Sequence, residues 1–517
     1  MGKHLGGLAA LGAVLAALAA AAPAGAQNAA SPAPAAKPAA SPPAANAAAP
    51  PAAGSAVVPA PAANPAAPAP AGGAAAPAPA AGAAPPPAAG AAAPAPAAAA
   101  PAPAIDWLAA AAASNMQIIG HSDLNGAGKG GEGLALQQYS GGRRVLFLAH
   151  ESGPMCFSVI DVTKPEQPTV ITQVPVEADF VRCNSLGVSD TTLVVAHQTE
   201  KPGQPYAGID IYDVSDPAHP KKLSHFDTSG PHSRGVHYVW FTDGHYAYLS
   251  TGARDFTPRN PDDDQFLMIV DVSDPEHPHD VGRWWLPGTR VGDAAAAPPR
   301  VEWPDSGIRM HSLTIPKERP DRAYVGWIDG GWVILDISDK THPKAIVRRS
   351  WQSLDSGFAH TVLALPARGI AIQSEEATQN NCADWPKRNW VWDIANEQHP
   401  YPLAPFPPVP DQAQLCHAGG RFGSHNIDMN RPIATSRMLV NTVVGSYFNG
   451  GVRAYSIADP SHPVEIGYII PKAPPGNTMH TIQINDIYVD ENGLIYANDR
   501  FTGGLYIIRY TGTVPLN

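Results

Sequence analysis

The chain has 517 residues, 4 cysteines and a net charge of −11 at neutral pH. It contains no run of basic residues, so we expect no nucleic-acid partner. Alanine and proline dominate the N-terminal part. Such a composition cannot bury apolar surface, and only the later part of the chain is therefore expected to fold around a core.

The first 26 residues have the features of a secretory signal peptide. Lys3 and His4 precede a short apolar run, and an Ala-Gly-Ala sequence ends at Ala26. The apolar run is too short to span a bilayer, and no later run suits a membrane helix. We therefore predict a signal peptide over residues 1–26, no transmembrane segment and a periplasmic or secreted location.

Residues 27–104 consist almost only of alanine, proline and glycine. This composition is typical of a disordered, partly extended tether. No lipidation cysteine follows the predicted signal peptide, so we expect no lipid anchor at this position. The segment is expected to act as a spacer towards an envelope partner.

A short cassette recurs through residues 105–517. Its copies are "FSVIDVTKPEQP", "IDIYDVSDPAHP", "LMIVDVSDPEHP", "WVILDISDKTHP", "WVWDIANEQHP" and "VRAYSIADPSHP", followed by "GLYIIRYTG". Seven key positions lie 52 to 65 residues apart and are occupied by Asp161, Asp213, Asp271, Asp336, Asp393, Ser456 and Arg509. In each copy an alternating apolar strand leads through a turn into another strand, and the spacing suits one four-stranded blade. Residues 105–517 are therefore predicted to form an all-β, seven-bladed β-propeller.

The cassette resembles the LVIVD repeat, and this resemblance implies a β-propeller without implying a particular activity. The last unit supplies only three strands. The segment "MQIIGHSDL", which begins at Met116, matches the fourth strands of the other units. We therefore expect an N-terminal strand to close the C-terminal blade and to remove both exposed edges.

One position at the start of each first strand holds histidine in five of the seven units. The seven residues are Glu132, Asn184, His237, His311, His360, His425 and His480. The first strand of a propeller blade is innermost, so these side chains are expected to converge on the central axis. Neutral imidazole and carboxylate groups are ligands for Cu, Fe, Mn or Zn, and the histidines with Glu132 are predicted to bind a transition metal. The alternative is a polar channel filled by hydrogen-bonded imidazoles and water.

This arrangement is similar in architecture to carotenoid-cleavage oxygenases and nitrous oxide reductase, which hold metals on histidines at the centre of seven-bladed propellers. It also resembles the selenium-binding, methanethiol-oxidase family. The resemblance implies a metal-dependent oxidoreductase or lyase that acts on a small molecule, although the rest of the sequence does not follow those families. The alternative is a non-catalytic extracytoplasmic propeller that binds or scaffolds a protein or surface polymer. No glycine-rich nucleotide loop is present, and no nucleotide cofactor is expected.

Long insertions are expected on the face that carries the ring, where a small molecule or a protein would bind. Glu375 and Glu376 are the candidate catalytic residues, because an adjacent carboxylate orients a ligating imidazole or serves as a general base. Further candidates for the channel or the substrate site, with Asn184, are His150, His197, Arg254, Asp329 and Asp499.

Four cysteines in an exported chain permit two disulfides in three connectivities. Cys382 and Cys416 lie on neighbouring predicted insertions and are expected to pair. This leaves Cys156 with Cys183. The alternative is a free Cys183 beside the channel mouth.

Overall fold

The computed structural model describes residues 106–300, 307–350, 357–384, 387–474 and 476–517. The predicted signal peptide and tether lie outside these residues. Within them, the only α-helix is α1 (Gln412–His417), which forms in an insertion that the sequence pattern left as a loop. Short 3₁₀ turns are η1 (Leu124–Gly126), η2 (Ser140–Gly142), η3 (Pro366–Arg368) and η4 (Asn380–Cys382). No helix of the described part is both long and apolar enough to cross a membrane.

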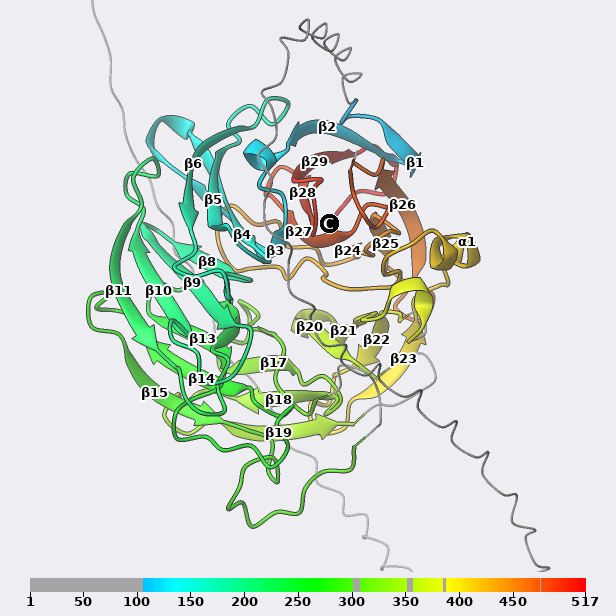
Figure 1. Cartoon of the computed structure of the whole chain (residues 1–517). Helices are drawn as coiled ribbons and strands as arrows, with labels where there is room; N and C mark the ends of the chain where they lie inside the picture. The colour runs from blue at the N-terminus through cyan, green and yellow to red at the C-terminus, as the bar shows by residue number, and fades with distance from the viewer. Residues whose placement is uncertain (1–105, 301–306, 351–356, 385–386, 475) are drawn as a thin grey trace, which may run out of the picture. The chain divides into compact units, whose positions relative to one another are not determined.

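The strands form seven antiparallel sheets that stand as blades around one axis (Figure 1). Blade 1 contains β3 (Gly130–Gln138), β4 (Arg144–His150), β5 (Met155–Asp161) and β6 (Thr169–Pro175). Blade 2 contains β7 (Val181–Arg182), β8 (Leu186–Ser189), β9 (Thr192–Thr199), β10 (Gly208–Asp213) and β11 (Lys221–Asp227). Blade 3 contains β12 (Val236–Trp240), β13 (Tyr246–Thr251), β14 (Phe266–Asp271) and β15 (His279–Trp284).

The remaining blades follow in chain order. Blade 4 contains β16 (Leu313–Thr314), β17 (Arg322–Gly326), β18 (Trp332–Asp336) and β19 (Lys344–Arg349). Blade 5 contains β20 (Ala359–Leu365), β21 (Ile370–Glu375), β22 (Trp390–Asp393) and β23 (Tyr401–Pro405). Blade 6 contains β24 (Thr442–Ser446), β25 (Val452–Ser456), β26 (Val464–Pro471) and β1 (Ala110–Ser114). Blade 7 contains β27 (Ile484–Val489), β28 (Leu494–Asp499), β29 (Leu505–Tyr510) and β2 (Met116–Ser122). The predicted seven-bladed propeller is confirmed.

In five of the seven cassettes the turn is formed by the aspartate at the key position. Asp271 ends β14, and its carboxylate accepts a hydrogen bond from the Ser273 backbone N–H at 2.8 Å. Asp213 and Asp336 accept the equivalent bond from the residue two further on. A side chain that bonds its own backbone two residues on closes a tight turn, which explains why the third and fourth strands of a blade are joined so briefly.

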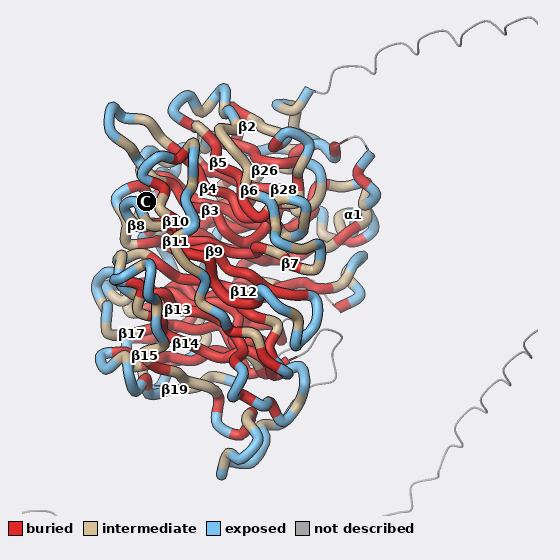
Figure 2. The backbone as a smooth tube through the Cα atoms, turned by 60° about the vertical axis from the view of Figure 1, so that its left-hand side comes forward, coloured by how far each residue is buried: buried red, intermediate tan, exposed pale blue. Residues whose placement is uncertain are grey.

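The core lies between blades as well as within them, and the inner strands are almost completely buried (Figure 2). One apolar cluster joins Leu249 and Ile269 of blade 3 to Val325 and Leu335 of blade 4. Each blade therefore stabilises its neighbours, and the ring depends on every blade being in place.

Two N-terminal strands close the ring. Strand β2 pairs antiparallel with β29, with Ile118 opposite Ile508, which confirms the predicted closure of the C-terminal blade. Strand β1, which the sequence pattern did not predict, pairs with β26 on the outside of blade 6. The N-terminal segment thus covers the outer edges of two neighbouring blades.

The closure can be tested on one strand, where Ile118 is buried and its neighbour Gln117 is exposed. Ile118→Asp is expected to lower the free energy of unfolding by about 3 kcal/mol or more, because it places an unpaired charge in the core. Gln117→Asp is expected to change it by no more than about 0.5 kcal/mol. Denaturant unfolding followed by tryptophan fluorescence measures both. Equal effects of the two substitutions would show that β2 does not hold the ring closed.

Candidate metal centre

A β-bulge aims one side chain of each inner strand at the axis. In β12 the pairing shifts between Val236 and Tyr238, and in β20 between Ala359 and Thr361, so His237 and His360 are the bulged residues. In β3 the irregular stretch contains Glu132. A bulge adds one residue to a strand and redirects the side chain of that residue. The bulged residues therefore do not follow the alternation that buries the neighbouring side chains between blades.

His311 and His425 occupy the same position in blades 4 and 6. The Gly326 carbonyl accepts a hydrogen bond from the His311 N–H, and the Gly326 N–H donates one to the Ser312 carbonyl. The Ser446 backbone bonds His425 and Asn426 in the same way. Two residues of the inner strand therefore oppose one residue of the next strand, as in a bulge. A Cβ at Gly326 would lie 2.1 Å from the His360 carbonyl oxygen, so a glycine is required where blades 4 and 5 meet at the axis.

Four of the five predicted histidines and Glu132 converge. The Nε2 atoms of His237, His311 and His360 lie 3.9, 3.7 and 3.6 Å from Glu132 Oε2. His425 Nε2 lies 3.8 Å from Glu132 Oε1. The Nε2 atoms of His237 and His311 are 2.9 Å apart. Groups of three ligand atoms in this cluster, called the central cluster below, lie within 4.8 Å of one another.

Three histidines of the central cluster, His237, His311 and His425, are held neutral. Burial lowers the pKa of His237 to about 3 and lowers the pKa values of His311 and His425 well below the ordinary value. Burial opposes the ionisation of Glu132, but the surrounding imidazoles, His360 first, hold the pKa of this carboxyl well below its usual range. The cluster therefore presents one carboxylate to several neutral imidazoles.

The tautomer of His425 follows from its partners. Nδ1 lies 2.7 Å from the Asn485 carbonyl oxygen, which only accepts hydrogen bonds, so Nδ1 carries the ring hydrogen. The Nε2 atom then points a lone pair at the carboxylates of Glu132 and Glu376, which are 3.8 and 3.7 Å away. Within the described residues, His425 Nε2, His360 Nε2 and Glu132 Oε2 are buried and have no hydrogen-bond partner.

Glu376 joins the central cluster and Glu375 does not. The Glu376 carboxylate lies 3.9 Å from His360 Nε2 and 2.9 Å from Arg421 Nη1. Glu375 instead accepts the backbone N–H groups of Gly357 and Phe358 at 2.9 and 2.8 Å. Burial raises the pKa of Glu375 to about 7. Of the two predicted catalytic carboxylates, only Glu376 is directed at the axis.

A cavity of about 120 Å³ lies over the central cluster. Its lining includes Glu132, His237, His311 and Glu376. His360 and His425 do not line it and are completely buried. One side of the cluster is therefore accessible from the cavity, and the other side is covered by protein.

Five arginines also line this cavity, and none of them was among the site residues predicted from the sequence. They are Arg182, Arg234, Arg309, Arg421 and Arg500. The sequence does contain a signal for four of them, because each stands two to four residues before an axial position, in "RCN", "RGVH", "RMH" and "RFGSH".

The structure places His480 outside the central cluster. His480 is exposed in a turn before β27 and has a φ of 61°. In blade 7 the bulge falls between Ile484 and Asp486, so Asn485 holds the axial position. His480 therefore lies five residues before the axial position of its blade, in the turn that leads into β27.

The other predicted channel residues do not line the cavity. Asn184 is buried at the axial position of blade 2, where its carbonyl accepts the Glu132 N–H at 2.6 Å. Asp329 accepts the Gly307 N–H, and Asp499 accepts the backbone N–H groups of Gln483 and Gly503. Arg254 is exposed and lies 3.6 Å from Asp227. The aspartates fix loop backbone, and the arginine lies at the surface.

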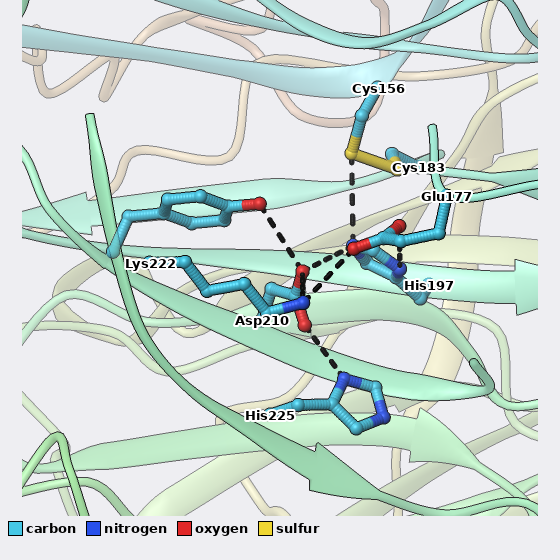
Figure 3. Close-up of a disulfide and its surroundings, with 8 residues drawn as sticks. Cys156, Glu177, Cys183, His197, Asp210, Lys222 and His225 are labelled. Atoms are coloured by element: carbon cyan, nitrogen blue, oxygen red, sulfur yellow. Dashed lines mark hydrogen bonds and ion pairs between the residues drawn. A yellow bond between two sulfur atoms is a disulfide. The ribbon is translucent and has the colours of Figure 1, made fainter. Parts of the chain in front are cut away.

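His197 belongs to a separate network beside the Cys156–Cys183 disulfide (Figure 3). Its nitrogens lie 3.4 Å from Glu177 and 3.3 Å from Asp210. Lys222 Nζ lies 2.6 Å from Asp210 and 3.0 Å from Glu177. Glu177, His197 and Asp210 lie close enough together to hold a metal ion. The Lys222 ammonium, however, already supplies a positive charge between the two carboxylates.

Both predicted disulfides are confirmed. Cys156 pairs with Cys183, and Cys382 pairs with Cys416. Disulfides persist in oxidising compartments, so the two bonds fit an extracellular or periplasmic protein.

Comparison with known families identifies the LVIVD repeat at residues 261–284 and 321–348. No curated protein matches the chain. Similar solved structures include the β-propeller domain of Myceliophteria thermophila Cps50 (Swd1), at 13% identity and a TM-score of 0.42, over 73% of this chain and 96% of that one. Another is the computationally designed Ika8 protein, at 12% identity and a TM-score of 0.38, over 74% of this chain and 98% of that one.

The buried, neutral state of His150 can be tested by the pH dependence of stability. Its Nδ1 contacts the Gly128 carbonyl oxygen at 2.7 Å and its Nε2 contacts Ser158 Oγ at 2.8 Å. Burial lowers its pKa from 6.5 to about 4. Between these pH values the unfolded chain binds a proton that the folded chain does not, so acidification favours unfolding.

His150→Gln is expected to reduce the loss of stability between pH 6.5 and pH 4 by about 3 kcal/mol, the linkage value of a shift of this size. Denaturant unfolding of chelator-treated protein at several pH values measures this slope. His219→Gln is the control, because the His219 side chain is 83% exposed. A slope that His150→Gln leaves unchanged would contradict the assignment of His150 as a buried neutral residue.

Proposed function

The chain is a seven-bladed β-propeller that carries LVIVD repeats, and we propose that its central cluster binds a transition metal ion for chemistry on a small molecule. The ligands are His237, His311, His360, His425 and Glu132. This donor set suits Zn, Cu, Fe or Mn.

The observation that carries the proposal is the meeting of lone pairs at a buried point. The Nε2 lone pair of neutral His425 faces the carboxylates of Glu132 and Glu376, and neither this nitrogen nor Glu132 Oε2 has a hydrogen-bond partner among the described residues. Acceptors that face one another repel, and leaving buried acceptors unpaired costs about 1–3 kcal/mol each. A cation at their common centre converts this repulsion into attraction.

The separations favour a metal ion over a bridging water. The carboxylate oxygens and imidazole nitrogens are 3.6 to 3.9 Å apart. Two atoms bound to one ion at about 2.1 Å lie at most about 4.2 Å apart. Two groups bridged by one water at hydrogen-bond length and tetrahedral angle lie about 4.6 Å apart.

The accessible side of the cluster favours a catalytic metal site over a structural one. Structural sites are closed on all sides, whereas catalytic sites keep a position for water or substrate. Here His237 and His311 line the cavity while His360 and His425 are covered. A bound transition metal would supply Lewis-acid or redox chemistry, which makes an oxidoreductase or lyase the reaction class that we propose.

Glu376 is the residue that we assign to proton transfer. Burial raises its pKa, and Arg421 holds one carboxylate oxygen at 2.9 Å while the carboxylate lines the cavity. A carboxylate whose pKa is raised is a stronger base than an ordinary carboxylate and is suited to act as a general base.

We also infer that the chain is exported. The two disulfides support this inference, together with the N-terminal sequence pattern. In this proposal the alanine- and proline-rich segment spaces the propeller from an envelope partner. A non-catalytic propeller that binds a protein or a surface polymer on the same face remains the alternative function.

Elemental analysis by mass spectrometry tests the metal proposal on chain purified without chelators or a histidine tag. Wild-type protein is expected to hold close to one equivalent of Cu, Fe, Mn or Zn. His360→Ala with His425→Ala is expected to lose the metal and stay folded, because each deletion removes a ligand and relieves acceptor repulsion. His462→Ala is the control, since that side chain is 81% exposed. Wild-type protein that binds none of these metals, even after reconstitution, would overturn the proposal.

Glu132→Gln separates a metal site from a hydrogen-bonded channel. The amide has the shape of the carboxylate but carries N–H donors for the nearby imidazole lone pairs. It is expected to lower metal affinity at least tenfold and to stabilise the metal-free protein by about 1 kcal/mol. Metal titration and thermal unfolding of chelator-treated protein measure the two effects. Unchanged metal affinity with lower stability would show that Glu132 is a structural residue.

A further inference from the structure

The charge on the cavity wall is opposite to the charge of the central cluster. Among the described residues, the cavity lining contains five arginines and two carboxylates, Glu132 and Glu376. Arg182 ends β7 and the other four arginines stand in separate loops, so the fold and not a local basic run gathers them. A water-accessible wall with this excess of guanidinium groups attracts anions.

Four of the guanidinium groups have partners outside the cavity, whereas Arg421 contacts Glu376 in its lining. Arg182 and Arg500 both contact Glu151 Oε1 at 2.6 Å. Arg234 makes two bonds to the Asp264 carboxylate, at 2.6 and 3.2 Å. Arg309 Nη1 contacts the Asp262 carbonyl oxygen at 3.2 Å. An anchored guanidinium loses little entropy when it binds a ligand, and its fork geometry matches carboxylate and phosphate oxygens.

The cavity volume of about 120 Å³ is well below that of drug-sized ligand pockets, which hold about 300–1,000 Å³, so the occupant is small.

We propose that this cavity binds a small anion whose carboxylate or phosphate group is held by the arginines while the rest of the molecule contacts the central cluster. The anion-binding part stands on the cavity alone. The contact with a metal rests on the function proposed above, and it identifies the substrate as a small organic anion. Arginine lining then orients the substrate on the accessible side of His237 and His311.

Isothermal titration calorimetry at low ionic strength tests the proposal on the folded chain. The probes are inorganic phosphate, succinate and succinamide, the uncharged diamide of succinate. We expect at least one of the two anions to bind and succinamide not to bind. The anion that binds more tightly distinguishes phosphate from carboxylate recognition. Binding of succinamide equal to that of succinate, or no binding of either anion, would overturn the proposal.

Arg500→Gln and Arg309→Gln test whether the arginines cause the binding. Arg500→Gln leaves Glu151 paired with Arg182 and is therefore expected to fold. Loss of one charge-assisted hydrogen bond is expected to weaken anion binding about tenfold or more. Arg254→Gln is the matched control, because Arg254 is exposed and outside the cavity lining. Circular dichroism confirms folding, and wild-type affinity in both folded cavity variants would contradict the proposal.

Each titration is performed on metal-loaded and on chelator-treated protein, so the two proposals fail separately. Arginine-dependent binding without any metal uptake leaves the anion site standing and removes the metal centre. Metal uptake without anion binding leaves the metal centre standing and removes the anion site. Phosphate binding that needs the metal and ignores the arginines counts against the anion site.

Discussion

The pairing of β2 with β29 is the constraint on which the rest of the structure depends, because it fixes the seam between the first and the last blade. Across this seam Asn485 donates to the Gly130 carbonyl at 2.9 Å, and Asn498 donates to the Gly131 carbonyl at 2.9 Å. These bonds hold the backbone on which Glu132 stands. An open ring would leave the carboxylate without a fixed position, so the closure that protects the sheet edges also positions the central cluster.

The inner strands then turn a common backbone irregularity into a converging site. A regular strand alternates its side chains between its two faces, and in this ring both faces pack against neighbouring blades. The bulge frees one residue of each strand from that alternation. His237 and His360 point to the axis for this reason, while Val239 and Val362, each two residues on, are buried in apolar clusters.

The sequence predicted the repeat, the closure and both disulfides, because each has a signal in local pattern or spacing. Four of the axial histidines that it selected lie together around Glu132, since their blades share a register. It misplaced His480, because a count of residues does not reveal that the bulge of β27 falls at Asn485. The arginines were missed because each is separated in sequence from the others, and only the closed ring brings them to one cavity.

Electrostatics connects the two proposed sites. Burying Glu132 and Glu376 at the axis requires positive charge nearby, and the neutral histidines do not supply it. Arg421 satisfies one carboxylate oxygen of Glu376, whereas Glu132 Oε2 has no hydrogen-bond partner among the described residues. The arginines therefore compensate the carboxylates from the cavity side only. A cation among the imidazoles would neutralise the other side, and an anion in the cavity would then face the arginines without direct repulsion from an uncompensated carboxylate.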